Sequence, residues 1–219
     1  MSIFHGSRIP ESQNLLSLVD AGSPRTASSG NINDLVYSGM SWTRSSGSYP
    51  MNNDTQNGVA CWNMDTGYIE TSTRLTLGQN YTLFYLWKPR LNDSGWRTMH
   101  RGDSDHWGII QDGTINLGMY SNRNGGFRDS GYDITRDVWQ TWIIVGTGNS
   151  ATSDTGTSRH YVNGVDVGTS DRVGSGTNTY RVGWTGQGPG KIAVAGILNN
   201  TAYNASQAKL LHNSLFARV

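Results

Sequence analysis

The sequence contains very little cysteine, lysine or glutamate. Only one of its 219 residues is a cysteine, Cys61, which excludes an intrachain disulfide and a multi-cysteine metal site. Lysine occurs three times and glutamate twice, so arginine and aspartate carry most of the charge. Protein interfaces are enriched in arginine and depleted in lysine and glutamate. A β protein also has few helical surfaces for those two residues, so the bias fits either a contact surface or an ordinary β fold.

A strong net charge and long apolar runs are absent as well. Seventeen basic residues against 16 acidic ones leave a net charge of +1, so no basic field attracts nucleic acid or anionic lipid. No apolar run approaches the roughly 20 residues of a membrane span, and "MSIFHGSRIP" (1–10) lacks the apolar region of a signal peptide. We expect a chain made in a cytoplasm, not secreted by a signal peptide, with no nucleic-acid or membrane partner.

Glycine and aromatic residues are abundant, with 28 Gly and 8 Trp. This composition favours a turn-rich, all-β protein. Two dipeptides predict two-residue hairpin turns, Asn163-Gly164 in "SRHYVNGVDVG" and Asp112-Gly113 in "HWGIIQDGTINLGMYS", because both residue types accept positive φ. Apolar or alternating segments predict further strands within 14–22, 58–71, 80–89, 137–148, 179–186 and 191–200.

One helix is predicted near the C-terminus, over residues 204–215. Asn204 can cap it, and Gln207 at the third helical position completes a capping box. Ala208, Leu211 and Leu215 form one apolar stripe, which we expect to pack on the edge of the sandwich.

Several segments resemble one superfamily. "VWQTWIIVGTG" followed by "SRHYVNGVDVG" resembles the core motif of concanavalin A-like or laminin-G-like jelly-roll domains, and "GPGKIAVAGILNNTAYNASQAKLLHNSL" resembles their ending. "NLLSLVDAGSPRT" resembles the opening of such domains on virion proteins of tailed bacteriophages, and "CWNMDTGYIET" is similar to one of their strands. The resemblance implies an all-β, concanavalin A-like (laminin-G-like) jelly-roll β-sandwich with a short C-terminal helix. It covers residues 14–219, after an N-terminal arm at 1–13.

The same resemblance implies a structural role. We predict a non-enzymatic accessory virion protein of a tailed bacteriophage, at the head, neck or tail, whose partners are other virion proteins or copies of itself. Residues 1–10 are predicted to contact such a partner, with Phe4 as an apolar anchor and Arg8 as a polar one. A disordered tail is the alternative.

A carbohydrate-binding adhesin module is the alternative function, with surface glycans as the partner. An exposed aromatic ring beside a glycine-rich turn can stack on a sugar, and four tryptophans lie in such places: Trp42, Trp96, Trp107 and Trp184. The other four lie within predicted strands and are expected in the core: Trp62, Trp87, Trp139 and Trp142.

Catalysis and cofactor binding are not predicted. A jelly-roll glycoside hydrolase, the third possibility, needs two carboxylates across the scissile bond, and no paired pattern includes Glu11 or Glu70. In "MHRGDSDHWG" (99–108), Asp103, Asp105 and His106 are candidates for a calcium site because these side chains ligate cations. A solvated turn explains this short segment equally well, so no metal site is assigned.

Overall fold

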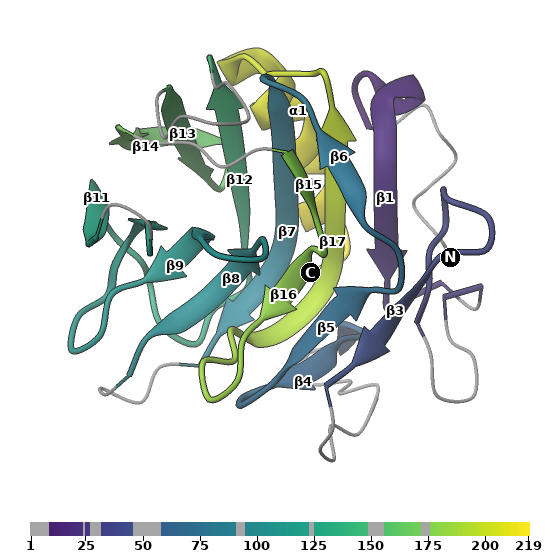
Figure 1. Ribbon diagram of the computed structural model, residues 1–219, viewed down its shortest axis with the longest axis horizontal. Coiled ribbons are helices and arrows are strands. Elements are labelled where there is room, and N and C mark those ends of the chain that lie inside the picture. Colours follow the sequence, from purple (N-terminus) through teal and green to yellow (C-terminus); the bar gives the residue numbers. More distant parts are fainter. Residues whose placement is uncertain are drawn as a thin grey trace.

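The computed structural model describes residues 9–23, 25–26, 32–45, 58–90, 95–122, 125–148, 156–171 and 176–219. Two antiparallel sheets stack face to face (Figure 1). The seven-stranded sheet contains β1 (Leu15–Asp20), β17 (Gly190–Asn199), β7 (Tyr81–Pro89), β12 (Gln140–Thr147), β13 (Thr157–Val162) and β14 (Val165–Ser170) in that order, with β4 (Trp62–Met64) paired to β17.

The eight-stranded sheet contains β11 (Phe127–Asp133), β10 (Asn116–Tyr120), β9 (His106–Ile110), β8 (Arg97–Arg101), β16 (Arg181–Gly183), β5 (Tyr68–Thr71), β3 (Ser41–Arg44) and β2 (Ile32–Asn33). A separate pair contains β15 (Gly176–Asn178) and β6 (Leu75–Leu77). The described helical segments are η1, a 3₁₀ turn at Ser12–Asn14, and the α-helix α1 at Ala205–Phe216. The predicted all-β sandwich with one short C-terminal helix is confirmed.

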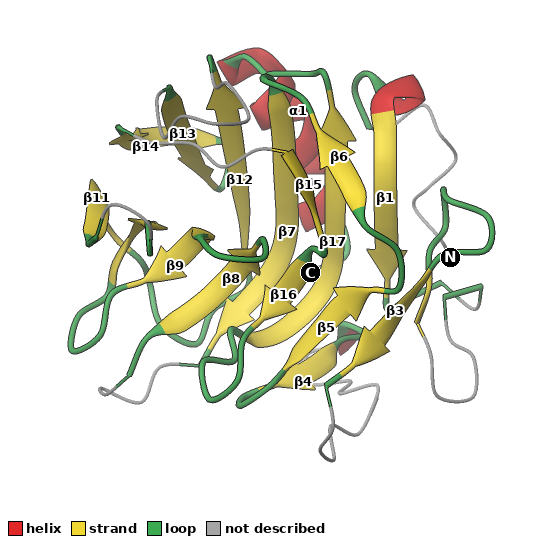
Figure 2. Ribbon diagram, viewed as in Figure 1, coloured by secondary structure: helices red, strands yellow, loops and turns green. Residues whose placement is uncertain are grey.

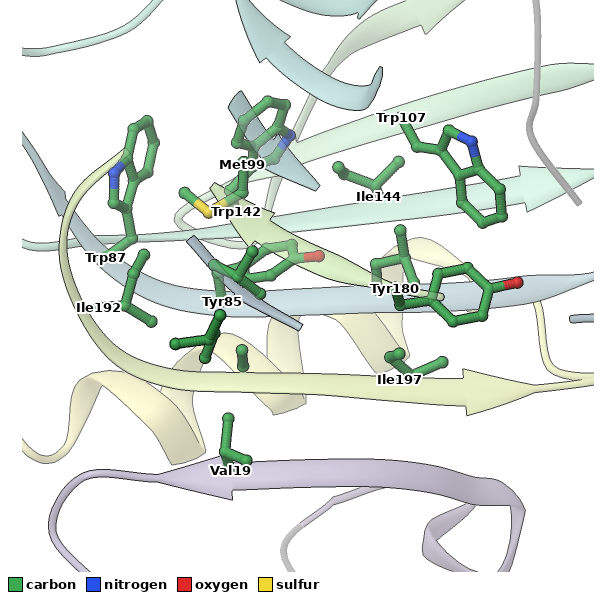
Figure 3. Packing of buried hydrophobic residues seen from close by; sticks show 14 of the residues in the cluster. Val19, Tyr85, Trp87, Met99, Trp107, Trp142, Ile144, Tyr180, Ile192 and Ile197 are labelled. Carbon is green, nitrogen blue, oxygen red and sulfur yellow. The ribbon is translucent and has the colours of Figure 1, made fainter. Parts of the chain in front are cut away.

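The main core lies between the two sheets. Trp87 and Trp142 from the seven-stranded sheet contact each other with ring centroids 5.6 Å apart, and Tyr180 lies farther along the same core beside Trp107, with ring centroids 5.2 Å apart (Figure 3). All four tryptophans predicted for the core are buried, with at most 6% of their surface exposed. Aromatic packing therefore supplies much of the buried apolar surface between the sheets.

A second apolar cluster lies on the outer face of the seven-stranded sheet. There α1 buries Ala208, Leu211 and Leu215 together with Phe84 and Leu86 of β7. This explains why β7 is apolar on both faces: one face meets the other sheet, and the second meets the helix. The helix lies across the sheet face behind β7 and β17 (Figure 2), so the expectation that it packs on the sandwich edge is wrong. A 12-residue helix can cover more apolar area on a face than at an edge.

The predicted capping box at the start of α1 is confirmed. Asn204 Oδ1 accepts the backbone N–H of Gln207 at 3.0 Å, and Gln207 Oε1 accepts the backbone N–H of Asn204 at 3.0 Å. Two of the backbone donors at the helix start are thereby satisfied.

The two predicted hairpins differ in their turns. Asn163 and Gly164 have φ values of 52° and 74°, and Val162 pairs with Val165, so this is the expected two-residue turn. The Asp112-Gly113 hairpin also forms, but Gln111 and Asn116 are the paired residues and four residues lie between them. Only Gly113 of that dipeptide has positive φ, so a type I′ turn is not formed and the prediction of a two-residue loop is wrong.

The N-terminal segment is described from Ile9 onward, so Phe4 and Arg8 lie outside the described residues. Ile9 is 3% exposed and belongs to the cluster under α1, and the Tyr203 hydroxyl donates a hydrogen bond to the Pro10 carbonyl. Residues 9–10 are thus packed on the sandwich of their own chain.

Candidate functional site

The outer face of the eight-stranded sheet has no described helix packed on it. Its strands alternate: Ile69 and Val182 point into the core, while Tyr68 and Arg181 lie on the opposite side and are half-buried. Strands β8, β16 and β5 lie on the side of the sandwich away from α1 (Figure 1). This face therefore holds polar and aromatic side chains that are not needed to close the core.

At one end of this face, flat side chains stack on each other. The rings of Tyr68 and Trp184 are stacked with centroids 5.4 Å apart, and the Arg101 guanidinium lies 4.0 Å from the Trp184 ring centroid. Because β16 runs between β5 and β8, Trp184 lies between the other two groups. Gly183, just before it, has φ 87°, a conformation that glycine adopts without strain.

The stack continues across the sheet. Arg101 Nη1 lies 2.6 Å from His106 Nε2, and the His106 ring meets Tyr120 edge-on with centroids 6.2 Å apart. Phe127 pairs with Tyr120 in the next strand, and the Trp96 ring contacts both of them at 5.1 and 5.8 Å. Six neighbouring strands thus contribute one planar group each. Five of these groups lie within their strands, and Trp184 directly follows β16. We call this set the planar row: Tyr68, Trp184, Arg101, His106, Tyr120 and Phe127.

Ion pairs border the planar row beside Trp184. Arg181 Nε lies 2.8 Å from Glu70 Oε2, and its Nη1 lies 3.7 Å from Asp103 Oδ1. Asp103 also pairs with Arg74 at 2.7 Å. The Arg181 guanidinium is 5.3 Å from the Trp184 ring centroid. Aromatic faces, guanidinium donors and carboxylate acceptors are therefore all within a few ångströms on this surface.

The hydrogen bonds of His106 fix its tautomer. A guanidinium can only donate, so His106 Nε2 accepts from Arg101, and Nδ1 carries the proton that reaches Thr98 Oγ1 at 2.8 Å. Thr98 in turn donates to Gln187 Oε1 at 2.7 Å. Burial, together with the positive charge of Arg101, lowers the pKa of His106 from 6.5 to about 3. The row is held by a neutral histidine at physiological pH.

The candidate calcium ligands do not form a metal site. His106 uses its free lone pair on Arg101, Asp103 is paired with arginines, and Asp105 Oδ1 accepts the Asn122 N–H at 2.8 Å. Within the described residues, no group of three or more His, Cys, Asp or Glu side chains is placed to hold a metal ion. The positive charges of Arg74 and Arg101 disfavour binding of a metal cation here.

The four candidate stacking tryptophans divide into two pairs. Trp96 and Trp184 are half-buried on the outer face of the eight-stranded sheet, with Trp184 in the planar row and Trp96 against its far end. Trp42 and Trp107 are only 1% and 2% exposed, so the expectation of accessible rings is wrong for them. Trp42 points inward and donates to Ser17 Oγ at 3.2 Å, and Trp107 stacks on Tyr81 between the sheets.

Most residues of the planar row were not predicted from the sequence. Tyr68, Arg101 and Tyr120 come from separate segments, and their proximity follows from a strand order that does not follow the chain. A usable signal was present in "YIET" and "RVG", where an inward Ile69 or Val182 alternates with outward polar or aromatic residues.

No protein-family profile matches this sequence, and no curated protein matches it either. Solved structures do match the fold. Trypanosoma rangeli sialidase in complex with sialic acid superposes with a TM-score of 0.63 at 11% identity, over 96% of this chain and 34% of the sialidase. The binding domain of botulinum neurotoxin DC in complex with SialylT has a TM-score of 0.62 at 12% identity, over 93% and 51%.

The binding domain of Paraclostridial Mosquitocidal Protein 1 has a TM-score of 0.61 at 18% identity, over 93% of this chain and 53% of that domain. The chain therefore spans between a third and about half the length of these structures. At such low identity the likeness shows a shared β-sandwich fold. No helix in the described ranges is long and apolar enough to cross a membrane.

Proposed function

We propose that this domain is a carbohydrate-binding module and that glycans bind on the outer face of the eight-stranded sheet, along the planar row. The observation that carries the proposal is the row itself: flat groups from six neighbouring strands, on a face that no described helix covers. Aromatic rings offer apolar surface to the C–H faces of sugars, while Arg101 and Glu70 supply hydrogen-bond donors and acceptors for hydroxyl groups. The similar solved structures support carbohydrate binding, which was the alternative function predicted from the sequence, better than they support the virion role.

Two neighbouring structures agree with the choice of ligand class. The sialidase is described in complex with sialic acid and the neurotoxin binding domain in complex with SialylT. Those ligands belong to those proteins. For this chain they support glycans, including sialylated ones, as the first compounds to test.

A glycan array probed with the wild-type protein and with Trp184→Ala tests the proposal. Removing a central aromatic anchor of an interface costs more than about 1 kcal/mol, which is a loss of affinity of roughly fivefold or more. Tyr37→Ala is the matched control, since Tyr37 is 45% exposed and lies outside the planar row. No glycan bound by the wild type, or equal binding by Trp184→Ala, would reject the proposal.

We propose that binding occurs without hydrolysis. Glu70 and Asp103 are carboxylates beside the planar row, and both pair with the same guanidinium of Arg181. Most glycosidases use one carboxyl group that donates a proton and another that attacks or activates water. Two carboxylates that share one guanidinium are arranged to position it. Turnover of any glycan in the panel, abolished by Asp103→Asn, would contradict this statement.

A virion setting remains a separate proposal, supported by the resemblance of residues 14–26 to phage virion domains. Its test is incorporation into particles after deletion of residues 2–8. The deletion must stop before Ile9, because that side chain is 3% exposed and belongs to the core. Unchanged incorporation of a folded deletion variant would remove Phe4 and Arg8 from the partner contact.

A further inference from the structure

One threonine beneath the planar row is sealed from solvent. Thr98 of β8 is 0% exposed, and its hydroxyl lies 2.8 Å from Nδ1 of His106, which is itself only 6% exposed. A bound ligand therefore cannot contact the Thr98 hydroxyl. Any influence of that hydroxyl on binding must pass through the side chains that it holds.

An irregular register brings two residues of β8 to the same histidine. Residues three positions apart in a regular strand point to opposite faces of the sheet, yet Thr98 and Arg101 both contact His106. The β8–β9 ladder shifts its register twice between them. One residue of β8 thus occupies each nitrogen of the His106 ring, so the orientation of the ring is fixed from both sides.

Thr98 also holds the turn that carries Trp184. Its backbone N–H donates to the Gln187 carbonyl at 3.0 Å, and its hydroxyl donates to Gln187 Oε1 at 2.7 Å. The Gln187 N–H donates to the Trp184 carbonyl at 2.9 Å, which closes the turn over residues 184–187. Gly186 in the same turn donates to the Thr66 carbonyl at 2.9 Å. The position of Trp184 is therefore tied to β8 through Gln187.

These contacts form a closed circuit, because the Arg101 guanidinium lies 4.0 Å from the Trp184 ring centroid. We call this set the positioning ring: Trp184, Gln187, Thr98, His106 and Arg101. Its side-chain donors all run one way, from Arg101 to His106, from His106 to Thr98 and from Thr98 to Gln187. Hydrogen bonds arranged in such a chain polarise and strengthen one another. Loss of the Thr98 hydroxyl removes two of them at once.

We infer that Thr98 is a positioning residue for glycan binding, which through the positioning ring holds Trp184 against Arg101 before a ligand arrives. The inference rests on the proposed function of the planar row. A side chain that is already ordered loses less conformational freedom when a ligand binds. Loss of the Thr98 hydroxyl should therefore weaken glycan binding about threefold to tenfold, although no ligand atom touches it.

Three substitutions isolate the hydroxyl. Thr98→Val removes it and keeps a branched side chain, and Thr98→Ser keeps it. Thr141→Val is the matched control, since Thr141 is also 0% exposed and its hydroxyl lies 3.0 Å from His212 Nδ1 on the face that α1 covers. The same chemical change there breaks a buried threonine–histidine contact far from the planar row. Circular dichroism of each variant confirms that it is folded.

The first measurement needs no glycan. Protein labelled with ¹⁵N-tryptophan gives one indole N–H signal for each of its 8 tryptophans by NMR, and Trp184→Phe identifies that of Trp184. Thr98→Val should shift this signal, whereas Thr98→Ser and Thr141→Val should leave it near its wild-type position. An unmoved Trp184 signal in Thr98→Val, or an equal shift in Thr141→Val, would overturn the inference. If Thr98→Val does not fold, Gln187→Met removes the acceptor at a half-buried turn position and is judged by the same criteria.

The second measurement is a calorimetric titration with a glycan that the array identifies. Thr98→Val should bind it about threefold to tenfold more weakly than the wild type, Thr98→Ser should restore the affinity, and Thr141→Val should leave it unchanged. Equal affinity of Thr98→Val and the wild type would overturn the inference even if the Trp184 signal moves. If the wild type binds no glycan, the proposed function fails and the role of Thr98 in binding falls with it, while the spectra still show whether the ring holds Trp184.

Discussion

Both outer faces of the sandwich are formed by antiparallel strands, but only the face of the seven-stranded sheet is covered by a described helix. On the seven-stranded sheet, α1 seals Phe84 and Leu86 from water. On the outer face of the eight-stranded sheet, the corresponding positions hold half-buried rings and guanidinium groups, and no described helix covers them. Substitutions on the sealed face should cost stability, and those on the open face should cost binding.

Acidification should produce the largest of the expected effects, a loss of unfolding free energy. Burial lowers the pKa of His100 and of His160 from 6.5 to about 3. Below pH 6.5 the unfolded chain takes up protons that the folded protein refuses, so stability is complete above pH 6.5 and falls as the pH drops toward 3. Each histidine contributes about 1.4 kcal/mol per pH unit.

Together, these two histidines should remove about 5 kcal/mol of unfolding free energy between pH 6.5 and 4.5, and His106, whose pKa is also lowered to about 3, should add to this loss. Urea denaturation at several pH values measures this. His106 on the open face also stays neutral down to about pH 3, so glycan affinity of the folded protein should not change over the same interval. A pH-independent stability would show that these histidines are not buried as described.

The sealed face can be tested by truncating the helix. Leu211 of α1 is fully buried against the seven-stranded sheet, so Leu211→Ala should lower the unfolding free energy by about 3 kcal/mol through lost apolar contact and a residual cavity. Leu210 is 58% exposed, so Leu210→Ala should change it by less than about 0.5 kcal/mol. Both are measured by urea unfolding. Weaker glycan binding by folded Leu211→Ala would contradict the expectation that the helix-covered face contributes to stability and not to binding.

The length of the open face occupied by ligand is tested at its far end. Trp96 contacts Tyr120 and Phe127, whose strands lie three and four strands away from β16, the strand that leads to Trp184. If a glycan spans the row, Trp96→Ala should weaken binding of a long oligosaccharide about tenfold, or about 1.4 kcal/mol. A monosaccharide should lose no affinity. Calorimetric titration with both ligands distinguishes a long groove from a single subsite at Trp184.

Local sequence signals predicted the elements well where one chemical requirement dominates. Asn163-Gly164 forms the expected turn because positive φ is needed at both positions, and Asn204 caps α1 because its side chain reaches Gln207. The candidate tryptophans were harder to assign. Proximity to a glycine-rich turn does not reveal which face of a strand a ring takes, and Trp42 lies at an inward position of β3.

Irregular register made the assignment of Trp107 harder still. The β8–β9 ladder shifts between Thr98 and His100 and again before Arg101, so strict alternation fails there and both Trp107 and Met99 face the core. The planar row itself depends on strand order: Trp184 and Arg101 meet because β16 lies beside β8. Nothing in either local segment specifies that neighbour.

The pairing of β1 with β17 has a consequence for how the chain is made. Leu18 pairs with Gly196, so an early strand has its hydrogen-bonding partner almost at the other end of the sequence. During synthesis β1 must stay unpaired until β17 has emerged, since contacts distant in sequence form only after long loops close. We expect slow, late completion of the seven-stranded sheet. A chaperone that shields unpaired strand edges should raise the yield of folded protein.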